Sequence, residues 1–134
     1  MTKIIENNDE RILLLVPLSS ITDMADPVRT PPWRTDTPLT KIVVQRCLSD
    51  QRYLQTPASE SEQDTLRHAM RIAWLHDNSW SDAISLEINE GSEVWPITDG
   101  NHRLYAAILR GDDEILVEVS GSLDMLEKHF SIEL

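Results

Sequence analysis

One short stretch gathers more chemically capable groups than any other part of the chain: Asp99, Gly100, Asn101, His102 and Arg103. An apolar run precedes it and helical spacing of apolar residues follows it, so the stretch is predicted to turn from a strand into a helix. The first N–H groups of a helix have no partner within the helix, and the helix dipole leaves partial positive charge there. The stretch therefore predicts a site for an anion.

The residue types at this turn suit such a ligand in different ways. Gly100 carries no Cβ, so a ligand can approach the backbone closely. Arg103 offers a fork of donors that matches phosphate or carboxylate oxygens, and His102 can donate or accept near pH 7. Asp99 can cap the helix, hold a metal or act as a base. Because a bare carboxylate repels phosphate, a phosphate ligand requires Mg²⁺ at Asp99 or an Asp99 that caps the helix.

The same residues also allow a structural interpretation without any ligand. In it the helix is simply capped, His102 lies on the surface and Arg103 pairs with a neighbouring acid. The local pattern does not decide between the two.

The elements that position this turn follow from hydrophobic spacing. Period-two alternation and short apolar runs predict strands at 11–18, 83–88, 93–98 and 114–119. Helical spacing predicts helices at 38–53 with Asp36 or Thr37 as N-cap, at 59–76 opened by the segment 59–62, between the turn and Gly111, and at 122–130. Trp74 and Leu123 are expected to face the core. The prediction is one domain, 1–134, of mixed α/β class, with a small mixed sheet flanked by helices.

A long irregular segment, 19–37, separates the first predicted strand from the first predicted helix. It is rich in turn residues and carries Arg29, Trp33 and Arg34. Loops of this length are uncommon unless they bind something or move. The alternative is an irregular surface segment with Trp33 packed on the core.

The charge balance excludes one class of function. The chain has 12 Lys and Arg against 23 Asp and Glu, a net charge of −11, which is unlike the basic surface of an autonomous duplex-DNA-binding protein. The acidic residues are spread along the chain. They indicate either a well-solvated surface or an acidic face that docks on a basic partner.

Composition also bears on location and metals. No apolar run approaches the length of a membrane span, and the N-terminus has no secretory signal. The single Cys47 rules out an internal disulfide and favours the cytoplasm. With one Cys and four scattered His, a structural zinc site is not expected. His68 and His76 are expected at the surface or at an interface.

The segment ITDGNHRLYAAILRG, residues 97–111, resembles the signature of the ParB/sulfiredoxin-like superfamily, in which a strand leads into a Gly-X-(His/Arg)-Arg helix. A looser resemblance covers 12–29, where an apolar strand leads into a loop bearing Pro and Arg. Residues 38–76 fall outside the resemblance and form a helical insert. The resemblance implies a ParB/sulfiredoxin-like fold that binds a nucleoside triphosphate with Mg²⁺.

Site residues follow from this resemblance by position. Gly100, His102 and Arg103 would grip the phosphates, with Asn101 in the same turn. Asp99 would lie near the metal or the substrate, and Arg29 would reach the ligand from the first loop. Asp99 and His102 would be the catalytic pair.

Two departures from the superfamily narrow the expected activity. Sulfiredoxins carry a nucleophilic Cys before the His-Arg pair, where this chain has Asn101, so sulfiredoxin chemistry is excluded. Partition proteins continue into a DNA-binding domain, whereas this sequence stops at Leu134 and lacks a basic surface. The expectation is a phosphotransferase or NTP hydrolase that acts on a nucleotide or a phosphorylated small molecule. The alternatives are a non-catalytic interaction module that uses acidic faces or Trp33, Trp80 and Trp95, and a ParB-like nuclease.

Overall fold

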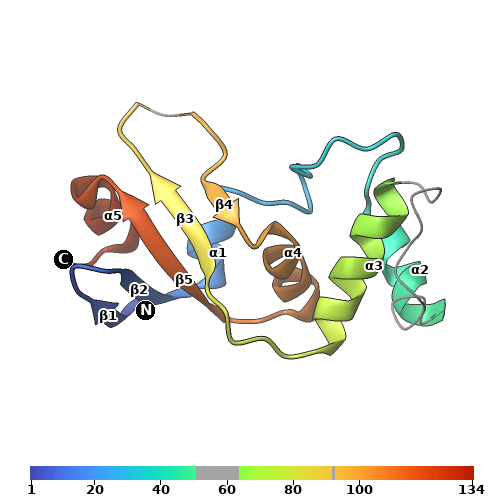
Figure 1. Cartoon of the computed structure of the whole chain (residues 1–134), viewed down its shortest axis with the longest axis horizontal. Coiled ribbons are helices and arrows are strands. Elements are labelled where there is room, and N and C mark those ends of the chain that lie inside the picture. Colours follow the sequence, from blue (N-terminus) through green and yellow to red (C-terminus); the bar gives the residue numbers. More distant parts are fainter. Residues whose placement is uncertain (51–63, 92) are drawn as a thin grey trace.

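Strands from both ends of the chain combine into one mixed sheet. The computed structural model describes residues 1–50, 64–91 and 93–134, and the strands in these ranges follow the order β1-β2-β5-β3-β4 (Figure 1). All neighbouring strands are antiparallel except β3 and β5, which are parallel. The strands are β1 (Lys3–Asn7), β2 (Ile12–Pro17), β3 (Ile84–Ile88), β4 (Ile97–Asp99) and β5 (Glu114–Gly121). The mixed α/β class predicted from the sequence is confirmed.

The helices also follow the predicted order, with shifted boundaries. They are α1 (Leu18–Thr22), α2 (Lys41–Asp50), α3 (Asp64–Asp77), α4 (Asn101–Arg110) and α5 (Leu123–Phe130). The short helix α1 and the edge strand β1 were not predicted, and β4 begins later than predicted. The proposed opening of the second helix at 59–62 lies outside the described residues. None of the helices in the described ranges is long and apolar enough to cross a bilayer.

The start of α2 was predicted wrongly. Neither Asp36 nor Thr37 is its N-cap, because the helix begins only at Lys41. The Val43 N–H donates instead to the Thr40 hydroxyl at 3.4 Å and to the Thr40 carbonyl at 3.1 Å. The Thr37 hydroxyl lies 2.8 Å from that of Thr65 on α3, so it ties the loop to another helix.

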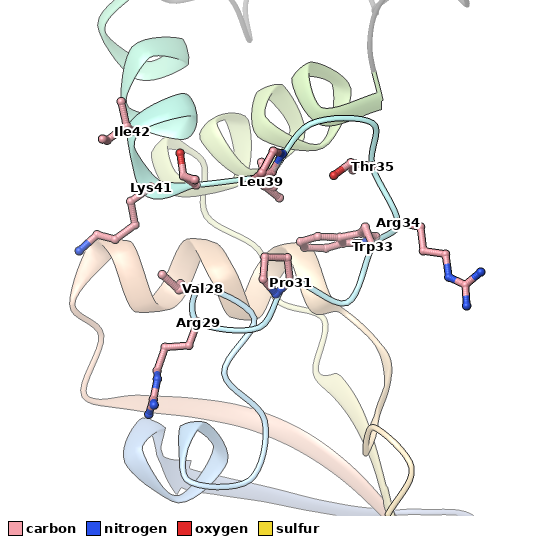
Figure 2. Close-up of a pocket in the computed structure, with 11 residues that line it drawn as sticks. Val28, Arg29, Pro31, Trp33, Arg34, Thr35, Leu39, Lys41 and Ile42 are labelled. Carbon is pink, nitrogen blue, oxygen red and sulfur yellow. The ribbon is translucent and has the colours of Figure 1, made fainter.

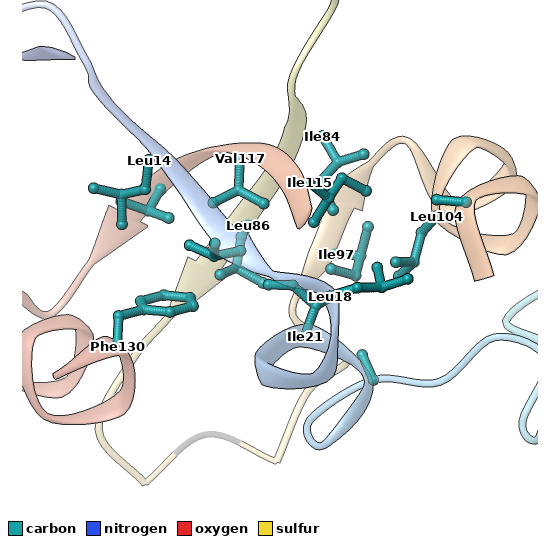
Figure 3. Close-up of a cluster of buried hydrophobic side chains, with 14 of the residues drawn as sticks. Leu14, Leu18, Ile21, Ile84, Leu86, Ile97, Leu104, Ile115, Val117 and Phe130 are labelled. Carbon is teal, nitrogen blue, oxygen red and sulfur yellow. The ribbon is translucent and has the colours of Figure 1, made fainter. Parts of the chain in front are cut away.

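One face of the sheet carries the main hydrophobic core. The strand register places Leu14, Val16, Ile115, Val117, Ile84 and Leu86 on the same face. Helices α1, α4 and α5 cover this face with Ile21, Leu104, Leu126 and Phe130, all buried (Figure 3). Each large apolar side chain buried in this way stabilises the fold by about 1.5–3 kcal/mol.

A second hydrophobic cluster lies between the helices at the end of the molecule away from both termini (Figure 1). It joins α2, α3 and α4 through buried side chains: Leu39, Val44, Cys47, Ala69, Ile72, Ala73, Tyr105 and Ala106. Helix α4 belongs to both clusters, because Leu104 and Ala107 face the sheet whereas Tyr105 and Ala106 face α3. The expected helical insert is therefore a separate layer attached to the sheet through α4.

Two residues predicted to face the core are exposed. Trp74 is 46% exposed and Leu123 is 52% exposed. The buried face of α3 is set by Ala69, Ile72 and Ala73, and one further residue turns Trp74 by about 100° away from it. Helix α5 is anchored by its later turns, through Leu126 and Phe130.

Candidate functional site

A pocket of about 430 Å³ lies between α3, the segment before β3 and the start of α4. Four of the residues predicted from the sequence line it: Asp99, Gly100, His102 and Arg103. The remaining lining residues come from α3 and from the segment that follows it: Arg71, Trp74, Leu75, Ser79, Trp80 and Asp82. The fold therefore brings the predicted turn together with helix α3.

The start of α4 keeps its amides available. Gly100 is the N-cap residue, and no described side chain makes a capping hydrogen bond there. The proposed capping role of Asp99 is therefore wrong, since Asp99 precedes the cap and its side chain is 75% exposed. Uncapped amides at a helix start, aided by the helix dipole, attract anions.

Gly100 is required for a different reason from the one predicted. Its φ is 95°, in the left-handed region that favours glycine. A Cβ at this position would lie 2.7 Å from Cγ2 of Ile84 and 3.2 Å from a guanidinium nitrogen of Arg103. The missing side chain therefore lets α4 approach strand β3, and it does not open space for a ligand.

Arg103 is mainly a structural residue. One guanidinium nitrogen donates to the carbonyls of Asp82 at 2.8 Å and Ala83 at 3.0 Å. The other lies 3.3 Å from the Asp99 carboxylate, and the side chain is only 15% exposed. Most of its donors are used within the protein, so Arg103 cannot offer a free fork to a phosphate as predicted.

Asn101 is also committed to the protein's own structure. Its Oδ1 accepts a hydrogen bond from the Trp95 indole N–H at 2.8 Å. Its side-chain amide lies 3.5 Å from the carbonyl of Ile97. At this position Asn101 fixes Trp95 against the turn that leads into α4, and its backbone N–H remains at the helix start.

His102 lies in an aromatic stack that the sequence did not predict. The Trp33 ring stacks on His102 and on His68, with centroids 4.4 Å and 4.8 Å away. His68 Nδ1 and His102 Nε2 are 2.8 Å apart, so one of the two donates to the other. The expectation that His68 is a surface or interface residue is replaced by a contact that joins α3, α4 and the first loop.

The stack keeps His102 neutral. Burial lowers the pKa of His102 from 6.5 to about 3, and the nearby His68 and Arg71 add to the effect. Burial likewise lowers the pKa of His68, with Arg67 and Arg71 contributing. At neutral pH His102 therefore adds no positive charge to the pocket. A base with so low a pKa is also far from the value near 7 that suits general base catalysis.

Arg71 is a second cation in the pocket beside Arg103, and it was not predicted from the sequence. Its side chain is exposed, lines the pocket and forms no hydrogen bond or ion pair with any residue the structure describes. Arg71, Trp74 and Leu75 follow helical spacing, which places them on one face of α3. That spacing was visible in the sequence. The sequence did not show that this face of α3 lies opposite the start of α4.

Arg29 does not join the other predicted residues. It lines a separate groove, together with Trp33 and the start of α2, and it points away from α3 (Figure 2). The predicted contribution of Arg29 to the same ligand therefore has no support in this arrangement.

Two carboxylates, Asp82 and Asp99, border the pocket, and they balance the charges of Arg71 and Arg103. Within the described ranges, no three His, Cys, Asp or Glu side chains are grouped so that they alone could hold a metal ion. Mg²⁺ needs fewer protein ligands, because it is bound by one or two carboxylates together with phosphate oxygens and water. The donor set fits that mode of binding.

Comparison with protein-family models, with curated proteins and with solved structures finds no match for this chain.

Proposed function

We propose that the chain is a ParB-like nucleotide-binding domain that holds nucleotide phosphates at the start of α4. The observation that carries the proposal is that the α4 amides and Arg71, neither bound to any side chain that the structure describes, meet in one pocket. Helix-start amides and an arginine are two independent donors for phosphate oxygens. The resemblance of residues 97–111 to the ParB/sulfiredoxin-like signature points to the same ligand.

Aromatic side chains in the pocket favour a ligand with a flat ring. Trp74 and Trp80 both line the pocket. Trp80 is held from one side by Arg110, whose guanidinium carbon lies 4.4 Å from the ring centroid. Arg110 is fixed in turn by paired hydrogen bonds to the Asp112 carboxylate. A nucleotide has both a flat base for such a wall and phosphates for the helix start.

As a phosphotransferase or NTP hydrolase the protein would use Mg²⁺, with Asp99 and Asp82 as the carboxylates beside the phosphates. When bound, the ion would neutralise charge on the phosphoryl group. The chain's own contribution is to hold the phosphates through the α4 amides and Arg71. His102, kept neutral in its stack, orients the first turn of α4, and its low pKa does not favour the catalytic role that the sequence suggested for it beside Asp99.

The test is direct binding of a panel of labelled nucleotides with Mg²⁺, measured by titration calorimetry. Arg71→Ala should weaken binding by about ten- to a hundredfold, because a charge-assisted hydrogen bond contributes about 1.5–3 kcal/mol. The matched control is Arg67→Ala, one turn earlier on α3, whose side chain is paired with Asp64 and does not line the pocket. It should change binding less than about twofold. Wild-type protein that binds no nucleotide would contradict the proposal.

Turnover is tested separately, by release or transfer of phosphate from each nucleotide that binds. Asp99→Asn should lower turnover more than it lowers binding, because Asp99 is assigned to the metal. Nucleotide binding without any turnover would exclude the enzymatic function but leave the assignment as a nucleotide-binding domain.

Absence of both nucleotide binding and turnover would favour the second candidate, a non-catalytic protein-interaction module on the same fold. The observation behind it is that Arg103 and Asn101 are already bonded within the protein. The sequence suggested Trp33, Trp80 and Trp95 as contact residues, but all three are half-buried and only Trp74 is exposed. Trp74 is therefore the anchor that this alternative would use.

A further inference from the structure

A groove separate from the α4 pocket runs between the first loop and the start of α2 (Figure 2). Its volume is about 730 Å³, within the range of about 300–1,000 Å³ that is usual for ligand clefts. Apolar side chains form its floor: Val28, Pro31, Trp33, Leu39 and Ile42. Ile42 lies in the first turn of α2 and is 60% exposed.

Three cations surround this floor. Arg29, Arg34 and Lys41 all line the groove, and none of the described lining residues is acidic. None of the three side chains forms an ion pair or hydrogen bond with a residue that the structure describes, although the Arg29 backbone N–H donates to the Asp26 carboxylate at 3.2 Å. In a chain with 23 acidic and 12 basic residues, a groove whose charged residues, among those that the structure describes, are all cations is unexpected.

The cations are spread along the groove. Arg29 and Lys41 extend on one side, and Arg34 extends on the opposite side, with Pro31 and Trp33 between them (Figure 2). A single phosphate would need donors that converge on one point. Cations on both sides of an apolar floor instead match a ligand that carries several anionic groups and apolar groups between them.

We propose that this groove binds an acidic peptide segment of a partner protein, with apolar side chains on the floor and carboxylates at Arg29, Arg34 and Lys41. A peptide ligand is favoured by both the net charge of the chain and the local charge of the groove. The net charge of −11 repels a long polyanion such as nucleic acid, which would extend beyond the groove over acidic surface. A short acidic segment meets only the cations of the groove, so local complementarity decides its binding.

The proposal is tested with a short fluorescent peptide of alternating glutamate and leucine, titrated with the full chain and followed by anisotropy. The double variant Arg34→Glu/Lys41→Glu reverses charge on both sides of the groove and should weaken binding at least about tenfold. Lys128→Glu makes the same type of change on α5, at the other end of the molecule, and should change binding less than about twofold. Binding should also weaken as salt is added.

The floor is tested through Ile42→Ser. This side chain is already exposed, so the variant should fold normally while binding the peptide about three- to tenfold more weakly. Its control is Ile5→Ser on β1, an exposed isoleucine far from the groove that should leave peptide binding unchanged.

Three results would overturn the proposal: no binding of the acidic peptide, peptide binding that survives the double charge reversal, or tighter binding of a single-stranded oligothymidine through the same cations. The last would assign the groove to nucleic acid. Nucleotide binding at α4 is measured with different probes and different variants, so each site stands or fails alone.

Discussion

At the residue scale, Arg103 joins the start of α4 to the segment before β3. Arg103→Ala should lower the free energy of unfolding by about 1–3 kcal/mol, because two backbone carbonyls lose the donor supplied by a side chain that is only 15% exposed. Urea denaturation would measure this loss. Arg67→Ala removes an exposed pair and should cost less than about 0.5 kcal/mol. Equal losses in the two variants would show that Arg103 is no more structural than a surface arginine.

His102 makes stability depend on pH. Its pKa is about 3 in the folded protein and 6.5 when unperturbed, so below pH 6.5 the unfolded chain takes up a proton that the folded chain refuses. Stability should therefore fall as pH drops from about 6.5 towards 3. His68 and Arg71, which face the ring from α3, and Trp33, which covers it, maintain the shift.

The pH effect is isolated by comparing the wild-type chain with His102→Gln in thermal unfolding at a series of pH values. The loss assigned to His102 should be about 1–2 kcal/mol, after allowance for its partial exposure. His76→Gln, in the last turn of α3 and outside the His102 stack, is the control and should keep the wild-type pH profile. If His102→Gln keeps it too, the neutral His102 has no part in acid sensitivity.

The Tyr105 hydroxyl is buried without a hydrogen-bond partner among the described residues. Burial raises the pKa of Tyr105 to about 12, and the charge of Asp26 adds to the rise. Because an unsatisfied buried hydroxyl costs about 1–3 kcal/mol, Tyr105→Phe should unfold at the same or higher urea concentration than wild type. A clear loss of stability would mean that the hydroxyl has a partner.

At the scale of elements, Gly100 decides how closely α4 approaches β3. Gly100→Ala adds both left-handed strain of about 1–2 kcal/mol and a clash with Ile84, which costs about 1–3 kcal/mol more. Gly111 at the other end of α4 has a φ of 77°, but a Cβ there would meet nothing within 4 Å. Gly111→Ala should therefore cost only the strain, and denaturation midpoints of the two variants test the difference.

The order and type of most elements could be read from the sequence, because their apolar spacing is local information. Strands β2, β3 and β5 and helix α4 with its glycine stop are such cases. The boundaries of α2 and β4 could not be read, since they depend on contacts such as the Thr37–Thr65 hydrogen bond. Strand β1 was missed for the same reason. Its side chains are mostly exposed, and its pairing with β2 defines it.

The candidate site was likewise predicted only where local residue types define it. The turn at Asp99–Arg103 was found from residue types alone, and four of its residues do line one pocket. The roles within the turn were not readable. Arg103 donates hydrogen bonds to two backbone carbonyls that lie 20 and 21 residues earlier in the chain. His102 shares a hydrogen bond with a histidine 34 residues earlier. Arg71 lies in the pocket because α3 packs on α4, and no local sequence pattern predicts this packing.

At the scale of the whole molecule, the two hydrophobic clusters give the chain two layers that share α4. The sheet cluster holds strands from both ends of the sequence, whereas the helical cluster depends on α2, α3 and one face of α4. The pocket and the acidic-peptide groove both border the helical layer, and Trp33 contributes to the groove and to the His102 stack. Both proposed sites therefore depend on this smaller layer.

Because the two layers share α4, we expect the helical layer to detach from the rest of the molecule by local unfolding. Detaching α2 and α3 exposes only the smaller cluster, so this layer should visit an open form more often than the sheet does. Amide hydrogen exchange should then be faster in α3 than in β2 and β5. A ligand that touches both α3 and α4 binds only the closed form, so it should slow α3 exchange selectively. Uniform exchange rates in the two layers would mean that the chain opens as one unit.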